Sequence, residues 1–153
     1  MGVDVTGPCE TPAALIANIP DSQLSGSGIV GNSYGYSRSR LHTQRNDDGN
    51  SGRGAWMPDE STVGEYIQAD FAQPQRIQAV ATQGRQDYDQ WVTSYKFAYS
   101  TDGVTYHYVT SADGSDRVFG GNSDRDTVVE HSFDVPIIQV FQSVYLSIKF
   151  SFV

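Results

Sequence analysis

The eight residues from Thr93 to Ser100 alternate almost ideally, placing Tyr95, Phe97 and Tyr99 on one face. A period of two is that of a half-buried β-strand. Asp102-Gly103 follows directly and is a strong signal for a tight turn, so we expect residues 104–109 to return as the second strand of a hairpin. The chain is therefore expected to build antiparallel β-structure.

Further short runs bounded by Gly, Pro, Asn and Asp read as strands in the same way. They cover residues 66–71, 77–82, 128–133 and 137–150. No segment shows a 3.6-residue period over three turns, and Pro8, Pro12 and Pro20 exclude a long helix near the N-terminus. The pattern predicts a single all-β domain, either a sandwich or a barrel.

Composition agrees with many short strands and turns. Charged residues make up 18% of the 153-residue chain, and Gly, Ser, Asn and nine tyrosines take their place. The net charge of −8 leaves no basic footprint for nucleic acid and disfavours an anionic membrane held by electrostatics alone. No apolar run approaches the ~18 residues that a membrane span requires, so we expect no transmembrane segment.

Three short motifs suggest chemistry that their context does not support. Residues 26–31 match G-x-G-x-x-G, but no buried strand precedes them and no helix follows. Residues 31–35 match G-x-S-x-G without the strand-to-helix turn of a serine hydrolase. Asp47 and Asp48 resemble the start of a calcium loop, though no Glu follows at the EF-hand distance; they are candidate calcium ligands or simply an acidic turn. We expect no catalytic activity.

Seven blocks in a fixed order carry a more specific signal. They are Gly54–Pro58, Glu65–Phe71, Val80–Arg85, Gln90–Lys96, Tyr99–Gly103, Val118–Asp124 and Phe133–Ile138. This succession resembles the discoidin family, also called the coagulation factor 5/8 type C domain, and residues 82–96 are especially similar to slime-mould discoidins, which are lectins. We assign residues 9–153 to the domain, with the resemblance strongest over 54–138, and treat residues 1–8 as an N-terminal extension.

The resemblance implies an eight-stranded jelly-roll β-sandwich with three ligand-binding loops at one end. Carried onto this chain, the loops span about residues 29–36, 44–53 and 84–90. The Gly-, Ser- and Asn-rich composition of residues 29–55 independently indicates long loops there. Members of the family bind galactose-type sugars, phosphatidylserine or proteins such as collagen.

The C-terminal region departs from the family pattern. The closing cysteine and the usual Trp-containing loop are absent, although residues 145–153 are expected to form a strand by their own pattern. Met57 stands where many members have another cysteine, and the chain's one cysteine, Cys9, is therefore expected to be a free thiol. The last strand is predicted to be atypical.

Sugar sites combine an aromatic face with polar groups that reach adjacent hydroxyls. The candidate ligand-binding residues are Tyr34, Tyr36, Asp47, Asp48, Arg85, Asp87 and Tyr88. Each tyrosine has the alternative role of covering apolar loop surface, and both tryptophans, Trp56 and Trp91, are expected in the core. We expect Arg85→Ala and Tyr88→Ala to weaken sugar binding without unfolding the domain.

The predicted function is that of a non-catalytic carbohydrate-binding and cell-adhesion module with glycans or glycoproteins as partners. Ile29 and Val30 offer weak apolar insertion, but the third loop has two acids against one base, so an anionic membrane is the weaker alternative. A collagen- or receptor-binding role is the other. An extracellular or cell-surface location is expected although Met1–Asp4 lack the features of a signal peptide, and avidity would need oligomerisation or a partner domain.

Overall fold

The computed structural model describes residues 2–5, 13–46, 52–140 and 143–152. Within these ranges the strands are β1 (Gly2–Val5), β2 (Ala13–Ala14), β3 (Leu24–Gly26), β4 (Glu65–Asp70), β5 (Gln75–Thr82), β6 (Gln90–Ser100), β7 (His107–Tyr108), β8 (Val118–Gly120), β9 (Val129–Val140) and β10 (Ser143–Phe152). Short helical turns are α1 (Leu15–Asn18), η1 (Asp21–Gln23), η2 (Asn32–Tyr34) and η3 (Tyr36–Ser39).

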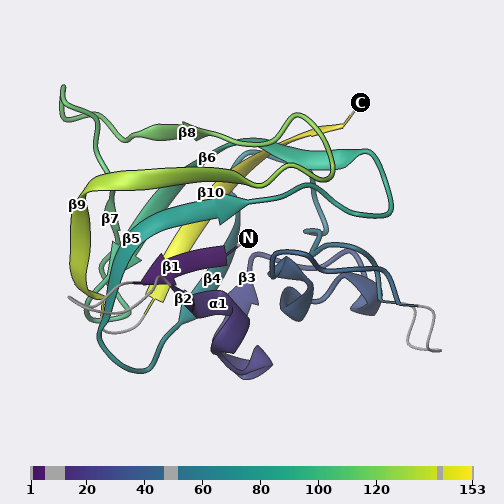
Figure 1. Ribbon diagram of the computed structural model, residues 1–153, viewed down its shortest axis with the longest axis horizontal. Coiled ribbons are helices and arrows are strands. Elements are labelled where there is room, and N and C mark those ends of the chain that lie inside the picture. Colours follow the sequence, from purple (N-terminus) through teal and green to yellow (C-terminus); the bar gives the residue numbers. More distant parts are fainter. Residues whose placement is uncertain (1, 6–12, 47–51, 141–142, 153) are drawn as a thin grey trace.

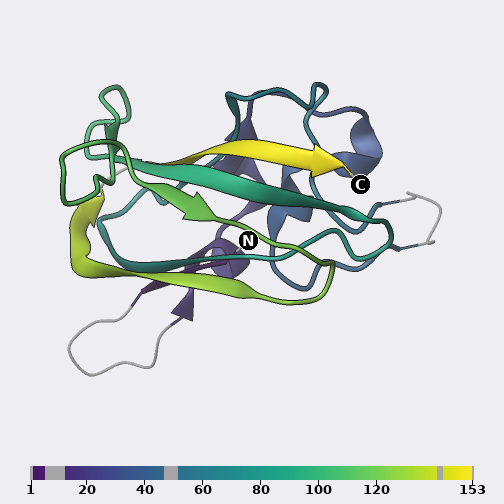
Figure 2. The same cartoon turned by 90° about the horizontal axis from the view of Figure 1, so that it is seen from above.

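The strands form two antiparallel sheets that pack face to face (Figures 1 and 2). One sheet has the order β2-β1-β5-β9, and the other has the order β3-β4-β10-β6-β7 with β8 also paired to β6. Of the strands in the described part of the chain, eight are three or more residues long and two are two-residue pieces. The predicted all-β jelly-roll sandwich is confirmed.

Strand β1 lies inside the first sheet. Gly2, Val3 and Asp4 are in register with Ala81, Val80 and Ala79 of β5. The segment that precedes the family-like sequence therefore contributes main-chain pairing to the sandwich.

The hairpin after β6 is shorter than the sequence indicated. The carboxylate of Asp102 accepts hydrogen bonds from the backbone N–H groups of Val104 and Thr105, at 2.8 and 2.7 Å. These donors close the turn, in which Gly103 has a φ of 73°, and do not join the ladder with β6. Only residues 107–108 return as strand β7, so the expected strand over residues 104–109 is wrong in length.

Strand β10 occupies the middle of the second sheet, as the yellow strand of Figure 2 shows. It pairs with β4 along Ser143 to Ile148 and with β6 along its whole length. The strand expected near the C-terminus is confirmed, and it is the element that joins β4 to β6.

Aromatic rings link the two sheets across the core. Phe97 of β6 contacts Phe133 of β9 with ring centroids 5.0 Å apart. Phe119 of β8 stacks on Tyr95 at 5.4 Å and meets Phe133 edge-on at 5.9 Å. Burial raises the pKa of the Tyr95 phenol, because the charged form loses its hydration. Trp56 is buried in this core, as predicted.

In the part of the chain that the structure describes, no helix is long and apolar enough to cross a membrane.

Candidate functional site

The described residues between β3 and β4 gather at one end of the sandwich, at the right of Figure 1. Residues 30–38 and 53–57 run beside each other, joined by hydrogen bonds from Arg53 N to Ser33 O (2.8 Å) and from Trp56 N to Arg38 O (3.0 Å). The β5–β6 connection, residues 83–89, lies against them. We refer to this connection as loop 3.

Loop 3 is closed at its base and directs two charged side chains inward. The backbone N–H of Arg85 donates to Gln90 O at 2.9 Å. The Arg85 guanidinium donates two hydrogen bonds to Asp87, from Nε to Oδ1 at 2.7 Å and from Nη2 to Oδ2 at 3.2 Å. Its Nη1 donates to Gln90 Oε1 at 2.6 Å. The two side chains are only 9% and 8% exposed, so this ion pair is an internal part of the loop.

The pair also joins loop 3 to the neighbouring segment. Gly54 N donates to Asp87 Oδ1 at 3.1 Å. The hydrogen bond from Arg85, followed by that from Gly54, lowers the pKa of Asp87 despite its burial. Burial acts against the charged form of Arg85, but hydrogen bonding to Asp87 and its negative charge outweigh it, and the Arg85 pKa is raised. Both groups are charged at neutral pH.

Two tyrosines flank the guanidinium of Arg85. Its Cζ lies 5.1 Å from the ring centroid of Tyr34 and 5.3 Å from that of Tyr88, within the range of cation–π attraction. Tyr88 is 58% exposed. The structure thus brings together four of the predicted site residues, Tyr34, Arg85, Asp87 and Tyr88.

The other predicted site residues lie elsewhere. The Tyr36 hydroxyl donates to Gly26 O at 3.2 Å, and its ring packs against the core, which is the alternative role weighed for the tyrosines. Asp47 and Asp48 lie outside the described residues, so calcium binding there stays a prediction. Among the residues that are described, no three His, Cys, Asp or Glu side chains gather as a metal site would require.

Loop 3 is tied on its other side to the β8–β9 connection. Arg125 Nε donates to Asp89 Oδ1 at 2.6 Å, and both side chains are partly exposed. Gly84 lies so close to this connection that a Cβ at this position would come within 2.4 Å of Asp124 O. The backbone of loop 3 is therefore held between two other segments.

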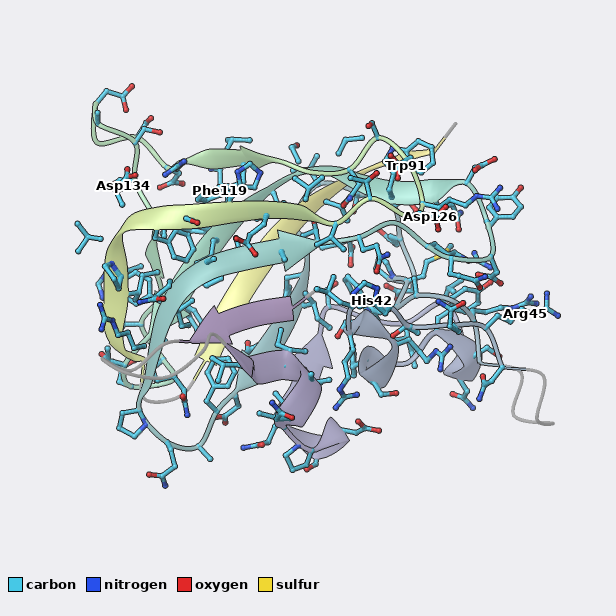
Figure 3. All side chains as sticks on the ribbon, in the orientation of Figure 1. His42, Arg45, Trp91, Phe119, Asp126 and Asp134 are labelled. Atoms are coloured by element: carbon cyan, nitrogen blue, oxygen red, sulfur yellow. The ribbon has the colours of Figure 1, made fainter. Side chains whose placement is uncertain are left out.

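A cavity of about 100 Å³ lies beside loop 3. Figure 3 shows His42, Trp91 and Asp126 at this end, whereas Asp134 marks the opposite end. The side chains that line the cavity include His42, Trp56, Gln86, Gln90, Trp91 and Asp126. We call this space the loop-3 cavity.

Trp91 is half-buried and lines this cavity, so its expected place in the core is wrong. The cause is a β-bulge in β6. Lys149 is paired with Ser94 and Phe150 with Val92, which leaves Thr93 as an extra residue. The bulge shifts the alternation by one position, and Val92 packs against the core instead. Sequence reasoning missed Trp91 because a bulge leaves no clear sign in the pattern.

Comparison with known proteins decides the family. The family model "F5/8 type C domain" matches residues 28–149, most of the chain. The chain belongs to the F5/8 type C domain family. The match extends past residue 138, the end of the last family-like block in the sequence, and includes most of β10.

A discoidin-1 chain of Dictyostelium discoideum is 44% identical over 86 residues, which cover 56% of this chain and 32% of that protein. The structure of discoidin II from the same organism superposes with a TM-score of 0.74 at 27% identity, over 84% of this F5/8 type C domain and 49% of that chain. This chain thus spans about a third of the one relative and about half of the other.

A family 32 carbohydrate-binding module from C. perfringens NanJ, solved in complex with galactose, has a TM-score of 0.56. The likeness covers 86% of this chain and 85% of that one at 13% identity, which shows a shared fold alone.

Proposed function

We propose that this F5/8 type C domain is a non-catalytic carbohydrate-binding module that recognises galactose-type sugars at its loop end and serves cell adhesion. The observation that carries the proposal is the position of Tyr88. Tyr88 is 58% exposed, and its ring centroid lies 5.3 Å from Arg85 Cζ in loop 3. An exposed aromatic face next to fixed polar groups suits the two sides of a sugar ring.

Two comparisons support the choice of ligand. Relatives that carry the discoidin name are 44% identical to this chain over 86 and 87 residues, 56% of its length. A module of the same fold was solved with galactose bound. The fold therefore accommodates galactose at least once, and the discoidin-like sequence favours a lectin role here.

The charge distribution of loop 3 favours a neutral ligand over an anionic membrane. Arg85 is neutralised by Asp87, and Asp89 is paired with Arg125, so loop 3 presents no basic rim to lipid headgroups. Val30 is 47% exposed, but the neighbouring Ile29 packs against the core. A single exposed valine offers little area for insertion.

A glycan array combined with sedimentation of phosphatidylserine liposomes tests the proposal. We expect signal for terminal galactose or N-acetylgalactosamine and no liposome binding at physiological salt. Strong liposome binding with no glycan signal would contradict the proposal and favour a lipid-binding domain. Binding to immobilised collagen with neither of the other signals would favour a protein-binding domain.

Single sugar sites are weak, so an adhesion role needs several copies. We propose that avidity comes from oligomerisation or from further domains, and that the domain acts at the cell surface or outside the cell. Size-exclusion chromatography with light scattering measures oligomerisation, and cell agglutination then measures avidity. A monomer that agglutinates no cells would mean that avidity has to come from further domains.

A further inference from the structure

A second cleft lies at the end of the sandwich opposite loop 3, between one edge of each sheet. Its walls come from the end of β6, from β7 and the two residues after it, from Arg117, and from residues 133–137 of β9. These elements lie at the left of Figures 1 and 2, and Figure 3 places Asp134 at that end. Its volume of about 570 Å³ lies within the roughly 300–1,000 Å³ of small-molecule sites. We call it the β7–β9 cleft.

A bend in β9 forms one wall of this cleft. Ser132 and Ile137 pair with β5 residues that are only two positions apart, so residues 133–136 of β9 stand opposite a single residue of β5. Extra residues on one strand bend that strand and leave the ladder. Asp134 and Val135 are consequently exposed, Val135 to 75%. The bend therefore turns a carboxylate and an aliphatic side chain out of the sheet at this end of the molecule.

Arg117 brings a positive charge to the cleft. Its half-buried guanidinium lies over the buried ring of Phe119, with Cζ 4.6 Å from the ring centroid, which orients the side chain. The adjacent carboxylate, that of Asp116, binds Lys96 at 2.9 Å instead. No carboxylate among the described residues pairs with Arg117, and its N–H donors are left for a ligand.

Asp134 supplies the opposite charge. In the described part of the chain its carboxylate has no hydrogen-bond or ion-pair partner, and it forms no ion pair with Arg117 although both line the same cleft. The two unlike charges are therefore present together without neutralising each other. A ligand that displaces their water has to return a partner to each, because a charged group that loses its hydration without compensation is costly.

This pair of charges restricts the class of ligand. Asp134 and the net charge of −8 repel a purely anionic ligand, and Arg117 repels a purely cationic one. An uncharged ligand leaves both groups without a partner. A molecule with an ammonium and a carboxylate group satisfies both, and an apolar side chain of that molecule finds a surface on Phe133 and Val135.

We propose that the β7–β9 cleft binds an α-amino acid or a short peptide with free ends. The carboxylate of the ligand lies on Arg117, its ammonium group on Asp134, and an aliphatic side chain against the apolar part of the wall. A guanidinium suits the first contact because it can donate two parallel N–H groups to one carboxylate. The cleft is remote from loop 3, so this site is independent of the proposed carbohydrate binding.

Calorimetry with leucine and with glycyl-leucine tests the site. We expect saturable binding, and the tighter of the two ligands distinguishes an amino-acid site from a peptide site. Acetylation of the amino group leaves only the carboxylate, and amidation of the carboxyl group leaves only the ammonium group. Each blocked form should bind about tenfold more weakly at a pH of about 6.5, where free α-amino groups are protonated, since it loses one charge-assisted hydrogen bond.

Two variants assign each charge of the ligand to its residue. Arg117→Gln should weaken the parent ligand and its acetylated form about tenfold, and should not weaken the amidated form. Asp134→Asn should weaken the parent ligand and its amidated form, and not the acetylated form. A disrupted fold would weaken all three alike, so this selectivity separates binding from structure. Glu60→Gln, exposed and outside the cleft, removes the same charge as Asp134→Asn and should bind as the parent protein does.

The chain's two tryptophans report where the ligand binds. Trp56 and Trp91 line the loop-3 cavity, so their indole N–H signals in a ¹H–¹⁵N spectrum should stay in place during the titration. Moving indole signals together with parental affinity in both variants would place the ligand at loop 3 and overturn the site.

Two further results would overturn the proposed ligand class. One is the absence of saturable binding of both leucine and glycyl-leucine. The other is tighter binding of glycerophosphoethanolamine, the zwitterion of a lipid headgroup. Neither result bears on carbohydrate binding, which the glycan array tests separately.

Discussion

Arg85 holds loop 3 together as well as lying at the candidate site. Its side chain is 9% exposed and bonds Asp87 twice and Gln90 once. Most of its donors therefore act within the protein. We therefore expect a ligand to contact polar groups at the rim of loop 3 and not the Arg85 guanidinium.

Replacing Arg85 with Ala should therefore affect stability. The change removes the two short bonds to the nearly buried carboxylate of Asp87 and leaves it only Gly54 N and, at 3.8 Å, Arg53 Nη1. We expect a loss of about 2–4 kcal/mol in the free energy of unfolding. Urea denaturation measures it. Tyr88→Ala, at an exposed position, should stay within about 0.5 kcal/mol of the parent. Equal stability of Arg85→Ala and the parent would show that the pair contributes nothing.

The lowered pKa of Asp87 predicts an acid-sensitive contribution to stability. A carboxyl whose folded pKa lies below its unfolded value stabilises the fold above the unfolded pKa, and this contribution disappears as the pH falls through the folded pKa. The difference in unfolding free energy between the parent and Asp87→Asn should be constant from pH 7 to about pH 5 and shrink below about pH 4. Denaturant titrations at several pH values check this. A difference that stays constant at low pH would contradict it.

At this scale the sequence predicted that the three loop-3 residues lie together, but not which way their side chains face. Arg85, Asp87 and Tyr88 lie within four residues, so their proximity followed from the pattern alone. That Arg85 and Asp87 turn inward depends on Gly54 N, which is more than 30 residues away. Contacts of that range leave no local signal.

Among the elements, the loop end depends on close backbone approach. A Cβ on Gly54 would lie 2.8 Å from Asp87 Oδ1 and 3.0 Å from Asp87 N. Gly84 meets the β8–β9 connection in the same way. These glycines are needed for the space they leave and not for a left-handed backbone.

Gly54→Ala should accordingly disturb loop 3 while the sandwich stays folded. Overpacking of this kind costs about 1–3 kcal/mol, and we expect a lower melting temperature together with faster hydrogen exchange over residues 83–90. Gly35→Ala is the matched control in the neighbouring segment, because its Cβ would meet only Asn32 O at 3.6 Å. Similar exchange rates in the two variants would mean that loop 3 tolerates the displacement.

Strand positions could be predicted where the alternation of apolar and polar residues determines them. They could not be predicted where a side chain forms hydrogen bonds with the backbone. β5 and most of β6 follow the expected pattern. The predicted length of the strand after β6 was wrong because Asp102 accepts hydrogen bonds from two backbone N–H groups that a longer hairpin would have used. The predicted core position of Trp91 was wrong because of the bulge at Thr93. Both departures arise from hydrogen bonding, which periodicity does not report.

For the whole molecule, the second sheet depends on β10. A proline at Ser147, which is in register with Tyr66 of β4 and Lys96 of β6, removes an N–H from a central strand. We expect a loss of about 3 kcal/mol or more, or failure to fold. Val118→Pro in β8, at the edge beside β6, should cost less. Circular dichroism and thermal unfolding compare them; similar losses in both would show that β10 is not central to stability.

The order of synthesis gives this arrangement a further consequence. The strands that flank β10 are complete by residue 100, yet they have no main-chain partner in common until residues 143–152 have left the ribosome. During translation, β4 and β6 each present an open edge for the time taken to add some 40 residues, a few seconds at about 5–20 residues per second. Chaperone engagement of the nascent chain should be strongest in that interval and end when β10 closes the gap.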